Sequence, residues 1–76
     1  AAVMLEGITG ANGVFIPDKD YWPRIRKLCS EKNIVLIADE VLSGFFRTGT
    51  WFGINHFDIT PDIITMSKGL TAGYAP

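Results

Sequence analysis

Three short apolar runs mark the strands that the chain is expected to form. They cover residues 1–5, 34–38 and 63–66, and each is bounded by glycine, proline or polar residues. Short, nearly uninterrupted apolar runs are typical of strands that are buried on both faces, as they are in parallel sheets. The pattern therefore predicts three strands, and the strand at residues 34–38 is expected to be buried.

A helical period separates the first two runs. Over Tyr21–Lys32, apolar positions recur at helical spacing and predict one mainly apolar face. Asp18 and Asp20 are candidates for the N-cap, and Pro23 suits the first turn, where a missing N–H costs little. Asn33 is expected to end the helix in the left-handed region. The predicted apolar face consists of Tyr21, Ile25, Leu28, Cys29 and Lys32.

The order strand, helix, strand predicts a βαβ unit, whose crossover connection requires the two strands to run parallel. Residues 8–13 have the glycines and asparagine of a loop with positive φ angles, and residues 14–16 are expected to be extended. Residues 42–60 are expected to be mostly loop, and a loop of this length inside a compact domain is usually functional. A glycine-rich exit is predicted after Lys68.

Chemically active side chains follow two of the apolar runs. Asp39 and Glu40 come directly after residues 34–38, and Lys68 follows residues 63–66. Open α/β sheets bind ligands just outside the carboxyl ends of their strands, so Asp39 and Lys68 are candidate site residues. Glu40 is expected to point to the opposite side of the extended chain and to be structural, anchoring the loop of Arg47.

Composition and charge narrow the class of protein. A chain of 76 residues, 47% hydrophobic and 20% charged, makes at most one small globular domain. Its net charge of −1 gives no reason to expect binding to nucleic acid or to an anionic membrane. The single cysteine, Cys29, favours a reducing compartment such as the cytoplasm, and no apolar run approaches the roughly 18 residues of a membrane span.

The first residues already have the character of a strand interior, without an initiator methionine or a signal peptide before them. We therefore expect residues 1–76 to be an internal part of a longer chain. Such a partial domain is expected to be inactive by itself.

Five motifs occur in the order and at the spacing of a known family. They are Glu6-Gly7-x-x-Gly10, Ile37-Ala38-Asp39-Glu40-Val41, Gly44-Phe45-x-Arg47-Thr48-Gly49, Pro61-Asp62-Ile63-Ile64 and Lys68-Gly69-Leu70. On these motifs the chain resembles the class III (ω-) aminotransferases, which are pyridoxal phosphate enzymes of fold type I. The resemblance implies an α/β fold, here a fragment of the mainly parallel-sheet large domain that binds the cofactor and carries out catalysis.

The resemblance also implies roles for four residues. Asp39 would lie beside the pyridine nitrogen of pyridoxal 5'-phosphate, where a carboxylate favours the protonated ring. Lys68 would hold the cofactor as a Schiff base and, once displaced, move the substrate proton. Val41 is expected to pack on one face of the ring. Glu6 stands where some members have a glutamate near the substrate pocket.

Three positions depart from the pattern of the family. Gly7 replaces a frequent proline, and Phe46 replaces a common glycine, which is expected to change how its loop turns. Leu42 replaces a glutamine that hydrogen-bonds the cofactor in many relatives, and leucine has no group for this bond.

The remaining candidates are interpreted as structural. His56 has no cysteine or histidine partner at metal-ligand spacing, so no metal site is predicted. Trp51, Phe52 and Phe57 are expected to be core residues rather than the lining of a substrate channel, and Cys29 is expected to be a core residue of the helix.

The resemblance implies that the complete protein is a homodimer that transfers an amino group by a ping-pong mechanism. The donor would be an amine or ω-amino acid, and the acceptor a keto acid such as pyruvate or 2-oxoglutarate. Aminomutases and decarboxylases of the same family remain alternatives, because Asp39 and Lys68 would serve them equally.

Two alternatives come from other classes. A P-loop ATPase also has an apolar strand that ends in Asp-Glu, but the glycines of residues 7–13 lack the Lys-Ser/Thr of a phosphate loop. A non-catalytic binding module is the other, because the phosphate-binding residues and the substrate arginine of the family are absent from the sequence.

Overall fold

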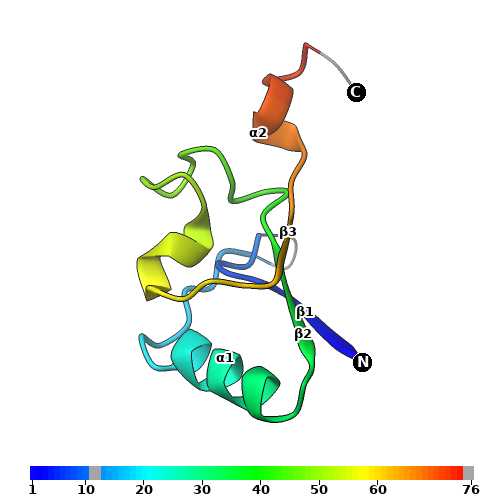
Figure 1. Cartoon of the computed structure of the whole chain (residues 1–76). Coiled ribbons are helices and arrows are strands. Elements are labelled where there is room, and N and C mark those ends of the chain that lie inside the picture. The colour runs from blue at the N-terminus through cyan, green and yellow to red at the C-terminus, as the bar shows by residue number, and fades with distance from the viewer. Residues whose placement is uncertain (11–12, 75–76) are drawn as a thin grey trace.

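Three parallel strands form the sheet of the computed structural model, which describes residues 1–10 and 13–74. The strands are β1 (Ala2–Glu6), β2 (Val35–Asp39) and β3 (Ile63–Thr65), with β2 in the centre (Figure 1). The predicted α/β class and the parallel crossover are confirmed. The parts of the predictions that concern Ala11, Asn12 and the end of the chain at Ala75 and Pro76 lie outside the described residues.

The register of the sheet aligns the carboxyl ends of the three strands. Glu6 is paired with Asp39, and Asp39 with Thr65, so these residues form one row across the sheet. Side chains alternate between the faces of a strand. Asp39 therefore shares a face with the row, whereas Ala38 and Glu40 point to the other face and are fully buried there.

Helix α1 (Tyr21–Glu31) covers the face to which Ala38 points (Figure 1). Its buried side chains are Trp22 and Cys29. The predicted core position of Cys29 is confirmed, but the predicted face is partly wrong, because Tyr21 is 40% exposed and Leu28 is 49% exposed. Trp22 takes the core position instead, since its indole nitrogen donates a 3.2 Å hydrogen bond to the buried carbonyl oxygen of Gly7.

The ends of α1 lie where they were predicted, but the predicted capping by a side chain is not observed. Asp20 occupies the N-cap position, but its side chain makes no capping hydrogen bond because its backbone is already helical, with φ −90° and ψ −8°. Asn33 follows the helix with φ 54°, which confirms the expected left-handed end. The extended piece at residues 14–16 is tied to the loop by an antiparallel bridge between Thr9 and Phe15.

The long connection between β2 and β3 contains a short helix that the sequence pattern does not indicate. This 3-10 helix, η1 (Gly53–Phe57), buries Ile54 and Phe57 against the core. Phe52 packs against the same core, but Trp51 is 59% exposed, so the expectation that it is a core residue is wrong. The connection also turns sharply where Phe46 replaces the common glycine, with φ 67°.

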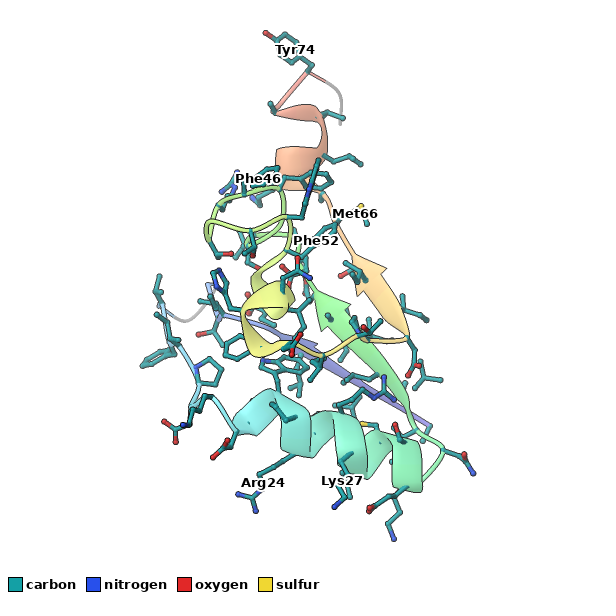
Figure 2. All side chains as sticks on the ribbon, turned by 60° about the vertical axis from the view of Figure 1, so that its left-hand side comes forward. Arg24, Lys27, Phe46, Phe52, Met66 and Tyr74 are labelled. Carbon is teal, nitrogen blue, oxygen red and sulfur yellow. The ribbon has the colours of Figure 1, made fainter. Side chains whose placement is uncertain are left out.

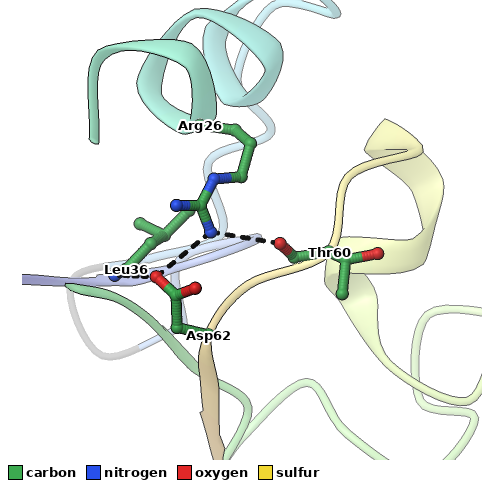
Figure 3. Close-up of polar contacts among 4 residues, drawn as sticks. All are labelled: Arg26, Leu36, Thr60 and Asp62. Carbon is green, nitrogen blue, oxygen red and sulfur yellow. Dashed lines mark hydrogen bonds and ion pairs between the residues drawn. The ribbon is translucent and has the colours of Figure 1, made fainter. Parts of the chain in front are cut away.

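The carboxylate of Asp62 joins β3, β2 and α1 (Figure 3). Its Oδ2 accepts a 2.8 Å hydrogen bond from the backbone N–H of Leu36 and lies 3.2 Å from Nη1 of Arg26. The backbone N–H of Asp62 donates in return to the carbonyl oxygen of Leu36. The hydrogen bond from Leu36, followed by the nearby guanidinium of Arg26, lowers the pKa of Asp62. The two hydrogen bonds between Asp62 and Leu36 fix how β3 enters the sheet.

Candidate active site

Asp39 ends the central strand at the edge where parallel sheets bind their ligands. Its Oδ1 accepts two hydrogen bonds, one from the backbone N–H of Val41 at 3.0 Å and one from the hydroxyl of Thr65 at 3.3 Å. The side chain is half-buried. Both donors converge on one carboxylate oxygen, which leaves Oδ2 without a hydrogen bond inside the described residues.

Glu40 is the structural partner of this site. Its buried carboxylate accepts hydrogen bonds from the hydroxyl of Ser43 at 2.9 Å, the N–H of Gly53 at 2.5 Å and the N–H of Ile54 at 3.2 Å. The expected structural role is therefore confirmed. The segment that it anchors is the start of η1, however, and not the turn at Arg47.

Lys68 begins a helix where a glycine-rich exit was predicted. Helix α2 (Lys68–Thr71) stands beyond the carboxyl ends of β2 and β3 (Figures 1 and 2), and Lys68 lies three residues after β3. The lysine is exposed and contributes to an open hollow. The hollow is lined by Phe45, Arg47 and residues 66–73. Lys68 is thus accessible to a reactant.

Gly69 explains how Lys68 is placed. A Cβ added to Gly69 would lie 2.8 Å from the Cβ of Phe45 and 3.2 Å from the carbonyl oxygen of Gly44. Any side chain at this position would therefore force α2 away from the loop after β2. The glycine that follows the lysine in the sequence is a requirement of this close approach.

The other predicted site residues lie around the same strand ends. Glu6 is the neighbour of Asp39 in the sheet register, and its Oε2 accepts a 3.0 Å hydrogen bond from the N–H of Gly10. Val41 is half-buried next to Asp39. Leu42 packs onto the loop of Gly10, where an added Cβ would lie 2.7 Å from Cδ1 of Leu42.

No contact in the described part of the chain joins Lys68 directly to Asp39. In pyridoxal phosphate the ring nitrogen is para to the carbon that carries the aldehyde, so the groups that hold this cofactor do not need to contact each other. The groups present fit that cofactor. They are the carboxylate of Asp39 with an unused oxygen, the accessible amine of Lys68 and the apolar side chain of Val41.

Thr65 is the site residue that sequence reasoning did not find. It stands at the end of β3 and contacts Asp39 through its hydroxyl. The signal that could have revealed it is its position as the last residue of a strand adjacent to the one that ends at Asp39, but the register was needed to pair the two.

Within residues 1–10 and 13–74, no group of three or more His, Cys, Asp or Glu side chains gathers as ligands of a metal ion would. His56 contacts the carbonyl oxygen of Thr48 at 2.7 Å. In the same residues, no helix is both long enough and apolar enough to cross a membrane.

Comparison with known proteins identifies the family. The sequence profile of the Aminotransferase class-III family matches residues 1–76. The chain belongs to the class-III aminotransferases. This class-III segment is 49% identical over 76 residues to a putrescine–pyruvate aminotransferase of Pseudomonas aeruginosa, covering all of this chain and 17% of the relative. It is 47% identical over 75 residues to a taurine–pyruvate aminotransferase of Bilophila wadsworthia, covering 99% of this chain and 16% of the relative.

Solved structures share the fold of the class-III segment. A transaminase from the marine bacterium Virgibacillus matches with a TM-score of 0.98 and 50% identity over all of this chain and 17% of its own. An ornithine aminotransferase of Plasmodium yoelii matches with a TM-score of 0.95 and 35% identity over 99% of this chain and 20% of its own. The chain thus spans about a sixth of the length of the curated relatives that it matches.

Proposed function

We propose that residues 1–76 form part of the large, cofactor-binding domain of a longer aminotransferase that uses pyridoxal 5'-phosphate. The observation that carries the proposal is the placement of Asp39 at the carboxyl end of β2 and of Lys68 beyond the carboxyl end of the neighbouring parallel strand β3. Membership of the class-III family supports the choice of cofactor.

In this proposal each residue of the site has one task. When bound, pyridoxal phosphate supplies an electron sink for the carbanion that forms at the substrate Cα. Asp39 would hold the protonated ring nitrogen, and Val41 would pack against a face of the ring. Nζ of Lys68 would hold the cofactor, and the free amine would accept the proton from the substrate Cα. Glu6 lies on the substrate side of the site.

The reaction that we propose is ping-pong transfer of an amino group from an amine or ω-amino acid to a keto acid. Two of the similar proteins are named for pyruvate as the acceptor, and their donors are taurine and putrescine. Pyruvate is therefore the first acceptor to test, and 2-oxoglutarate the second. A mutase or decarboxylase would use the same Lys68 and Asp39, and product analysis distinguishes these reactions.

Exposed apolar side chains support the proposal that further protein covers this end of the sheet. Leu70 lines the hollow of Lys68, Phe46 stands between the lining residues Phe45 and Arg47 in the chain, and Trp51 contacts Phe46. Phe46, Trp51 and Leu70 are each more than half exposed. Exposed apolar groups that gather in this way are typical of interaction surfaces. We propose that the rest of the chain and the second subunit of a homodimer cover them.

The buried, unpaired Cys29 fits a reducing compartment, for which we propose the cytoplasm.

The direct test measures amino transfer by the full-length protein that contains this segment. With taurine, putrescine or β-alanine as donor and pyruvate as acceptor, we expect the formation of alanine. Lys68→Ala is expected to lose about 10²–10⁴-fold in rate or more, because both the attachment point and the proton-transfer group are removed. Lys32→Ala, a lysine that follows α1, is the matched control.

The proposal would be wrong in two cases. The first is a wild-type protein that binds pyridoxal phosphate but forms no alanine from any of these donors. The second is a Lys68→Ala protein that is as active as the Lys32→Ala control. If a decarboxylated or rearranged product formed instead of alanine, the reaction but not the cofactor site would need to be replaced.

A further inference from the structure

We propose that Thr65 is a positioning residue for Asp39: its hydroxyl fixes the orientation of the carboxylate so that Oδ2 is presented to the cofactor nitrogen. The inference rests on the proposed function, because it assigns Thr65 a task towards the same cofactor. Thr65 does not itself reach the reacting atoms in this arrangement.

The geometry at the end of the sheet carries the inference. Thr65 is the register partner of Asp39 across β2 and β3, and its hydroxyl lies 3.3 Å from Oδ1. The N–H of Val41 binds the same Oδ1 at 3.0 Å. One donor alone would allow the carboxylate plane to rotate about the bond, whereas two donors from different segments define the plane. Oδ2 is then the oxygen left for a ligand.

The backbone holds Thr65 rigidly in this position. Its carbonyl oxygen accepts a 2.9 Å hydrogen bond from the N–H of Glu40, directly after Asp39. Glu40 is in turn fixed by its buried carboxylate. A β-branched side chain has few accessible χ1 rotamers, so the hydroxyl of Thr65 is preorganised towards Asp39. Valine would suit a strand end equally well in shape but would lack the donor.

The test uses cofactor affinity, which does not depend on turnover. Pyridoxal phosphate is titrated into the full-length apoprotein, and quenching of tryptophan fluorescence gives the dissociation constant. Thr65→Val removes the hydroxyl, Thr65→Ala removes it without the branched methyl group, and Thr65→Ser keeps it. Thr60→Val makes the same chemical change at an exposed threonine before β3 and is the control. Melting temperatures of the apoproteins report any loss of folding.

We expect Thr65→Val and Thr65→Ala to bind pyridoxal phosphate about 3- to 10-fold more weakly than wild type, the range that one hydrogen bond corresponds to. Thr65→Ser and Thr60→Val should bind within about twofold of wild type, which is less than that range. The inference is overturned if Thr65→Val and Thr65→Ala bind as tightly as Thr60→Val, or if Thr65→Ser binds as weakly as Thr65→Ala. A wild-type protein that binds no pyridoxal phosphate overturns the proposed function instead.

Discussion

Asp39 and Glu40 are adjacent acids that differ in burial and in the side of the chain to which they point. Strand alternation predicts that they point to different faces, and the structure places Glu40 in the core and Asp39 at the carboxyl end of β2. The sequence could not show the partners of Glu40, because Gly53 and Ile54 lie in a loop without a regular period. Nor could it show that Thr65 shares Oδ1 of Asp39, since that contact depends on the register.

Replacing Glu40 by glutamine tests the buried carboxylate. The amide of Glu40→Gln turns one acceptor into a donor that faces the backbone N–H of Gly53 or Ile54. We expect a loss of about 1.5–3 kcal/mol in the free energy of unfolding, the range for a hydrogen bond to a charged group. Thermal unfolding of the full-length protein measures it.

Asp58→Asn is the control for this prediction, because Asp58 is exposed and its left-handed conformation, with φ 55°, is tolerated by asparagine. An equal melting temperature for the Glu40→Gln and Asp58→Asn proteins would show that the carboxylate of Glu40 contributes no more stability than a neutral amide.

At the scale of elements, the long and regular features follow from sequence and the short ones do not. The three strands and α1 appear where the apolar pattern predicts them, within a residue or two. Helices η1 and α2 are too short to show a period, so they were missed. On α1 the period allows either Tyr21 or Trp22 to face the core, and the hydrogen bond from Trp22 to Gly7 decides between them.

The junction at Asp62 predicts a pH dependence. The hydrogen bond from Leu36 and the charge of Arg26 hold the pKa of Asp62 below its ordinary value of 3.8. A lowered carboxylate pKa contributes stability above the ordinary value, and this stability is lost as the pH falls through the folded-state pKa. We therefore expect Asp62→Asn to melt at a lower temperature than wild type near about pH 7, with the difference shrinking below about pH 4.

Melting temperatures of wild type and Asp62→Asn across this pH range check the prediction. Asp58→Asn again serves as the control, since Asp58 is exposed and its side chain makes no hydrogen bond or ion pair within the described residues. A difference between wild type and Asp62→Asn that stays constant with pH would contradict the assigned role of the Asp62 charge.

Gly69 of α2 lies close to the loop after β2. We therefore expect a substitution at Gly69 to lower the activity although Lys68 itself is unchanged. In Gly69→Ala the new methyl group would collide with Phe45 and with the carbonyl oxygen of Gly44, so the helix must move. We expect a loss of about 10²-fold in the rate of amino transfer, as a displacement of about 1 Å can cause. Leu70→Ala, on the same helix with a mostly exposed side chain, should lose much less. Equal rates for the two variants would refute the positioning role of Gly69.

At the scale of the whole molecule, residues 1–10 and 13–74 cover the sheet on one face only. Helix α1 and η1 pack on the face of Leu36 and Ala38, whereas Met4 and Ile63 on the other face are about half exposed. Parallel sheets are normally covered on both faces. The fold class of these 76 residues was predictable from the pattern of strands and helix. The residues that would bind the phosphate of the cofactor and set the substrate specificity were not predictable, because none was recognised in this sequence.

The proposed chemistry depends on Lys68 being the residue that holds the cofactor. In the most direct measurement, the full-length protein is loaded with pyridoxal phosphate and then reduced with sodium borohydride. The reduction converts the Schiff base between the lysine and the cofactor into a stable amine. Mass spectrometry then identifies the modified peptide. We predict the phosphopyridoxyl group on Lys68, in the peptide that follows β3. Modification of a different lysine, or a peptide of Lys68 that stays unmodified while the protein binds the cofactor, would contradict the account.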